Sequence, residues 1–278
     1  MERRNFLQIL NEKGISPIRE YERLYELFYT CPIQEANGNC FTLKDYVAWN
    51  FLDVPFRKTC LSIEDFDSTY GFHFVEKPYK VDLNYLLSFC EYTYNFVIWM
   101  SCESNLFRYG NRQQSQLYID QVRRVIESIG YMPLIQGYVT TFVPKMPEAI
   151  TVSEIVSPDV SYKVLEYNHY TMKGDIARKR ETLRILADQL EPKRAELATI
   201  NKELASNVFF MFNNMNIRHN NRTKGNKNNY KEVIAEMSQD ELENWYDETY
   251  QMCLLAFLEL DNVERTKKVA ELKASFGK

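Results

Sequence analysis

The stretch "RAELATINKELASNVFFMFNNMNI", residues 194–217, decides the fold because apolar side chains recur in it every three or four positions. This spacing places them on one side of an α-helix and predicts that this side is buried. The apolar stripe consists of Leu197, Ile200, Leu204, Val208, Met211, Phe212 and Met215. We therefore predict a long helix that packs against other helices.

Neighbouring segments repeat this pattern. Helices are predicted at 159–172, 175–191, 238–261 and 263–276. Ser238 and Glu241 have the spacing of a capping box, which marks the start of one of them. Long helices joined by short connections form antiparallel bundles, so residues 157–278 are predicted to be a helical-bundle domain.

Residues 1–156 are predicted to form a second, mostly helical domain. Helices are expected at 17–30, 43–51, 62–70, 83–105 and 113–129. Two β-prone runs flank Gln136 and Gly137, and this pattern predicts a β-hairpin at 131–143. The fold class is therefore mainly α, with one small hairpin.

Composition points to a cytoplasmic protein without a cofactor. The formal charge is -4, and the six cysteines include no C-x-x-C pair at metal-ligand spacing. The N-terminus lacks the apolar core of a signal peptide, so reduced thiols are expected. The most apolar segment, 83–102, contains Glu91 and Asn95, which favours a buried helix over a membrane span.

The stretch "NIRHNNRTKGNKNN", residues 216–229, contains six asparagines, several basic residues and no acid. Counting three positions on from Met215 extends the apolar stripe to Arg218. An unpaired buried guanidinium is too costly to keep, so Arg218 must either form an ion pair or face a polar cleft. In the first case its partner is expected to be Asp247 or Glu248, and the asparagines only shape the turn.

In the second case the loop handles phosphate without a metal. Arg218 offers a planar fork to phosphate oxygens, and His219 can move a proton near neutral pH. Such a pair can promote attack of an RNA 2′-hydroxyl on the adjacent phosphodiester. Asn214, Asn220 and Asn221 are then expected to orient the two groups.

The segment "FFMFNNMNIRHNN" (209–221), followed by the acidic and aromatic "ELENWYDETYQMCLLAF" (241–257), resembles the HEPN class of prokaryotic helical domains. The resemblance covers residues 157–278. It implies RNA binding or metal-independent RNA cleavage in a defence system, such as abortive infection or a toxin pair, and a homodimer. Arg218 matches the first position of the class motif and His219 its polar second position.

This sequence departs from the class motif at one point. The histidine expected four to six residues after the arginine is absent, since positions 222–224 are Arg, Thr and Lys. Either His219 carries the proton instead, or the domain binds RNA without cutting it.

Two basic groups are candidates for contacts with RNA phosphates. They are Arg222, Lys224 and Lys227 in the loop, and Arg178, Lys179 and Arg180 in the helix predicted at 175–191. The alternative for the second group is a solvated helix face.

A different function remains open beside RNA chemistry. The chain is then a non-catalytic interaction module, in which the N-terminal half recognises a protein partner and the bundle dimerises.

Overall fold

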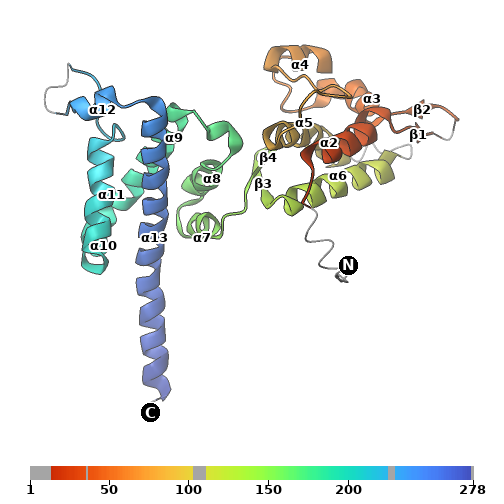
Figure 1. Ribbon diagram of the computed structural model, residues 1–278. Helices are drawn as coiled ribbons and strands as arrows, with labels where there is room; N and C mark the ends of the chain where they lie inside the picture. The colour runs from red at the N-terminus through yellow and green to blue at the C-terminus, as the bar shows by residue number, and fades with distance from the viewer. Residues whose placement is uncertain (1–13, 36, 103–110, 225–228, 277–278) are drawn as a thin grey trace, which may run out of the picture. The chain divides into compact units, whose positions relative to one another are not determined.

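The computed structural model describes residues 14–35, 37–102, 111–224 and 229–276. The chain divides into two compact units, one ending at Phe142 and the other beginning at Val143 (Figure 1). The architecture is mainly helical, as the sequence predicts, and its strands form two-stranded sheets.

The first unit is built around α5. Its elements are α2 (Pro17–Tyr25), the π-helical turn η1 (Glu26–Thr30), β1 (Ile33–Gln34), β2 (Cys40–Phe41), α3 (Leu43–Trp49), η2 (Phe51–Asp53), α4 (Ile63–Tyr70), α5 (Leu83–Cys102), α6 (Asn111–Ser128), β3 (Tyr131–Gln136) and β4 (Val139–Pro144), whose end crosses the unit boundary. The predicted helices and the β3–β4 hairpin are confirmed, although positions 103–105 of the predicted 83–105 helix lie outside the described residues. The β1–β2 pair was not predicted, because two residues per strand leave no alternating pattern to detect.

Polar side chains on α5 hold the hairpin. Asn95 donates to the Thr140 carbonyl at 2.7 Å and accepts from the Thr140 amide at 2.7 Å. The Glu91 carboxylate accepts from the Phe142 amide at 2.8 Å. These bonds explain why an apolar helix carries an amide and an acid. Within the described ranges, no helix combines the length and apolarity needed to cross a bilayer.

The second unit is a helical bundle. Its elements are α7 (Pro147–Ile155), α8 (Pro158–Glu166), η3 (Tyr170–Met172), α9 (Ile176–Leu190), η4 (Glu191–Lys193), α10 (Arg194–Ile200), α11 (Lys202–Asn214), α12 (Glu232–Glu236) and α13 (Gln239–Phe276). Its core includes Phe209, Phe212 and Phe257, and the rings of Tyr167 and Tyr250 stack with centroids 4.0 Å apart.

Two predicted helix boundaries in the bundle are wrong. The helix predicted at 194–217 is broken at Asn201, whose extended backbone (φ -143°) separates α10 from α11. The Asn201 side chain accepts a hydrogen bond from the Leu204 amide at 3.0 Å and so caps α11. Conversely, the helices predicted at 238–261 and 263–276 form one continuous helix, α13.

Other elements also differ from the prediction. The helix predicted at 159–172 ends at Glu166 and is followed by a separate 3-10 turn, while α7 and α12 were not predicted. The sequence places the domain boundary after α7, whereas the structure places it before this helix. Ala149 and Val152 of α7 are buried in the core of the second unit.

Candidate functional site

The candidate loop begins where α11 ends, at Asn214. Asn216 adopts a left-handed backbone (φ 57°), and the Arg218 amide donates to the Phe212 carbonyl at 3.0 Å. The chain therefore reverses before the helical count reaches Arg218. Ile217, which is fully buried, fills the core position at this point, and Arg218 is only partly buried.

Acidic side chains flank the guanidinium of Arg218. Its Nη1 forms an ion pair with Glu191, and its Nη2 lies 3.8 Å from an Asp188 carboxylate oxygen. The predicted partners Asp247 and Glu248 are wrong, since Asp247 instead accepts from Lys179. The Arg218 side chain is 25% exposed, so solvent screens the pair in part.

The loop asparagines shape the backbone. Asn221 is buried: its side chain accepts from the Asn216 amide at 2.7 Å and donates to the carbonyls of Asn213 and Asn229 at 3.2 and 2.7 Å. Asn214 donates to the Phe210 carbonyl at 2.9 Å. Asn221 therefore fixes the turn of the loop.

The end of the loop nearest the solvent contains His219 and Asn220, both exposed. The Asn220 side chain accepts from the amides of Arg222 and Thr223 at 3.2 and 3.1 Å. The hydrogen bonds described for the side chains of Asn214, Asn220 and Asn221 go to loop or helix groups other than the side chains of Arg218 and His219. Arg218 and His219 are therefore close to each other only because they are consecutive in the chain.

Lys179 does not belong to a solvated basic face. It is buried, with Nζ 2.7 Å from Glu243 and 2.6 Å from Asp247, and 5.3 Å from the centre of the Tyr167 ring. Burial opposes ionisation of Glu243, but hydrogen bonds from Lys179 and from the Gly174 amide outweigh it and leave the pKa of this acid below 4.5. Lys179 thus joins α9 to α13.

Most other predicted RNA contacts also interact within the bundle. Arg178 pairs with Glu166 at 2.7 Å, and Arg180 donates to the Ile217 carbonyl at 3.4 Å. Arg222 donates to the Met237 carbonyl at 3.0 Å, at the end of α12. Lys224 is exposed, and Lys227 lies outside the described residues.

Tyr246, beneath the loop, was not predicted to take part in the site. It is fully buried, and its hydroxyl lies near the Asn216 side chain without forming a hydrogen bond of ordinary geometry among the described residues. Burial raises the pKa of this phenol, while Asn216 and the positive charges of Arg180 and Arg222 act in the opposite direction.

Asp188 and Glu191, the acids that meet Arg218, were also missed. The sequence does contain a signal for them, because both lie at the C-terminal end of a helix, where negative charge is unfavourable without a nearby cation. Helical spacing predicts that they share a face, but it does not identify the arginine that reaches them.

Comparison with known proteins adds no further constraint on the site. No protein family model, curated protein or solved structure matches this chain.

Proposed function

We propose that the chain is a non-catalytic helical module that binds another protein, and that α13 presents the binding surface. The observation that carries this proposal is an exposed apolar stripe beyond the bundle. Leu272 is 57% exposed and Phe276 is 82% exposed. Apolar groups gathered on one face are stabilised by burial against a partner.

The first unit supports the same proposal with a second exposed group. Trp49 and Leu52 are each 58% exposed, and Leu61 is 73% exposed. The Trp49 ring meets Phe41 edge-on, with centroids 4.6 Å apart. Exposed aromatic side chains are typical of binding surfaces, so the N-terminal half could contact a partner as well.

Site-specific photo-crosslinking tests the proposal. A photoreactive phenylalanine analogue at position 272 should give covalent protein adducts in the cells in which the gene is native. The same analogue at Ala274, roughly 200° around α13 from Leu272, is the matched control and should give few. An absence of adducts from position 272 would contradict an interaction role for this helix.

A second candidate function is RNA binding or metal-independent RNA cleavage, as in a HEPN-like protein of a prokaryotic defence system. The basic loop supports it, since Arg218 is 25% exposed and Lys224 is exposed, so both could donate to an RNA phosphate. His219 is exposed in the same loop. In this proposal RNA displaces Glu191 from Arg218. The free cysteines suit a reducing cytoplasm.

Incubation with RNA in a chelator tests this second candidate. Cleavage with 2′,3′-cyclic phosphate ends should fall at least about 100-fold in His219→Ala and Arg218→Ala, the range expected for a lost general acid or charge-stabilising group. Asn214→Ala is a control, since its side chain bonds only locally. Intact RNA with the wild type would reject cleavage, and unchanged RNA affinity in Lys224→Ala and Arg218→Ala would reject binding through this loop.

A further inference from the structure

The exposed stripe of α13 has the spacing of a coiled-coil seam. Its members alternate at intervals of three and four residues: Leu255, Leu258, Asn262, Arg265, Val269, Leu272 and Phe276. This heptad spacing keeps one face of a helix turned towards another helix over several turns. We call these seven residues the α13 seam.

Apart from Leu258, which packs partly against the bundle core, the α13 seam lies outside the face that α13 buries in its own bundle. The last buried residue of the helix is Leu260, and every residue from Glu264 to Phe276 is exposed. Within the second unit, α13 continues past the ends of α7 and α10 (Figure 1). The last turns of α13 therefore lack a partner within this unit.

Local interactions alone give this extension little stability. Ion pairs join Arg265 to Asp261 at 2.6 Å and Lys267 to Glu264 at 2.6 Å. Such pairs add only about 0.2–0.5 kcal/mol each to a helix. Short helical segments without tertiary contacts are marginal in water, so a partner helix would stabilise the extension.

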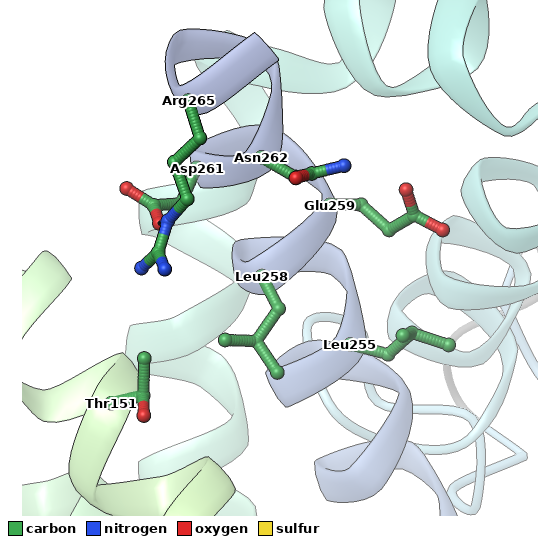
Figure 2. A pocket seen from close by; sticks show the side chains of 7 residues that line it. All are labelled: Thr151, Leu255, Leu258, Glu259, Asp261, Asn262 and Arg265. Atoms are coloured by element: carbon green, nitrogen blue, oxygen red, sulfur yellow. Dashed lines mark hydrogen bonds and ion pairs between the residues drawn. The ribbon is translucent and has the colours of Figure 1, made fainter. Parts of the chain in front are cut away.

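A groove lies along the first half of the seam. It has a volume of about 390 Å³ and is lined by Thr151 of α7 together with Leu255, Leu258, Asn262 and Arg265, flanked by Glu259 and Asp261 (Figure 2). Its apolar floor and polar rim suit a helix that carries apolar residues between charged ones. The second half of the α13 seam has this character.

We infer that the partner is a second copy of this chain, with the two α13 seams paired antiparallel. In one register Leu255 faces Leu272 of the second copy, Leu258 faces its Val269, and Asn262 faces its Arg265. The two polar layers then meet each other at the centre, and apolar layers lie on both sides. Sliding either helix by a heptad would place the polar groups against apolar ones.

Charge favours the antiparallel direction over the parallel one. In the antiparallel register, Asp261 lies beside Lys268 of the second copy, and this attraction occurs twice. A parallel pair would place Arg265 against Arg265 and Lys268 beside Lys273. The seam also lies at the opposite end of α13 from the 216–224 loop, so the pairing leaves that loop open (Figure 1).

This inference rests on the proposed interaction role of α13, and sedimentation tests it directly. The full chain should be a dimer at about 100 µM, where even a micromolar complex would form. Leu272→Glu should shift it to a monomer, whereas Ala274→Glu, roughly 200° around the helix, should leave the dimer intact. Both residues are exposed, so neither variant disturbs the fold. A monomeric wild type, or a dimer that tolerates Leu272→Glu, would overturn the inference.

The direction of pairing is tested by mixing two cysteine variants. Cys31, Cys40 and Cys102 are first replaced by serine, because they are not buried and would react with the crosslinker. Cys60, Cys90 and Cys253 are buried and are kept. A short bismaleimide should join Leu258→Cys to Val269→Cys when the proteins are mixed, and join neither variant to itself. Self-linked products would show parallel pairing and reject the register.

The photo-crosslinking experiment at position 272 separates failure of the inference from failure of the proposed function. Adducts with twice the mass of the chain support a second copy. Adducts of other masses only would reject the inference and keep the interaction role. No adduct would reject both.

Discussion

Asn221 is the residue on which the shape of the candidate loop depends. It is buried, and its amide side chain bonds to the backbone of Asn216, Asn213 and Asn229. Asn221→Ala would leave these groups unsatisfied, so we expect the free energy of unfolding to fall by about 2 kcal/mol. Urea denaturation measures the change. Asn214→Ala is the control, and an equal loss in both variants would contradict the assigned role.

Lys179 is the second residue with a large expected effect on stability. Lys179→Met would leave Glu243 and Asp247 close together without their cation. We expect a loss of about 2 kcal/mol at pH 7, less than for a fully buried pair because Asp247 is half exposed. Denaturation of Lys179→Met and of the exposed-residue control Lys202→Met measures this loss. Equal stability of the two variants would show that the ion pairs contribute little.

The same cluster predicts a dependence on pH. The pKa of Glu243 is lowered in the folded protein, so its contribution to stability is present above about pH 4.5 and is lost as the pH falls through the lower folded-state pKa. Wild-type stability should therefore fall more steeply than that of Lys179→Met between about pH 5 and pH 3. Denaturation curves across this range compare the two slopes, and parallel slopes would contradict the assignment.

At the scale of elements, some helix starts could be predicted from the sequence, but other helix boundaries could not. Ser238 and Glu241 form the predicted capping box, with the Ser238 hydroxyl accepting from the Glu241 amide at 3.2 Å. The break at Asn201 interrupts a continuous apolar stripe, so periodicity conceals it. Past Leu260 the bundle contacts of α13 end, although the helix continues. The sequence pattern changes at this point, and for this reason it predicts two helices instead of one.

The partners of charged residues were the hardest part to predict. Arg218 meets Glu191 rather than Asp247, and Asp247 meets Lys179. Each choice depends on how α9 lies against α11 and α13, which helical spacing does not determine. A single sequence therefore predicts which residues lie in the candidate site better than it predicts which of them form ion pairs with one another.

The extension of α13 should show its dependence on a partner in amide hydrogen exchange. Residues 264–276 are exposed, whereas residues 246–260 contact the bundle core. In the monomeric Leu272→Glu variant we expect fast exchange over 264–276 and slow exchange over 246–260. In the wild type, protection of 264–276 should rise with protein concentration. Concentration-independent protection would indicate that the extension is stable alone.

At the scale of the whole molecule, the chain is two separately cored units, and the position of their boundary is open to a direct test. The hairpin belongs with the first unit, because Asn95 and Glu91 hold its second strand. α7 belongs with the second unit, because Val152 is fully buried in the bundle core. A fragment that begins after the hairpin should therefore contain a complete core.

We expect fragment 145–278 to unfold cooperatively, since its core is complete. Fragment 157–278, which begins at the boundary suggested by the sequence, lacks Ala149 and Val152. Exposure of the surface beneath them should cost about 3 kcal/mol, given about 1.5–3 kcal/mol for a buried valine and less for an alanine. Thermal unfolding followed by circular dichroism compares the two fragments. Equal transition temperatures would mean that α7 adds nothing to the bundle and that the boundary lies after it.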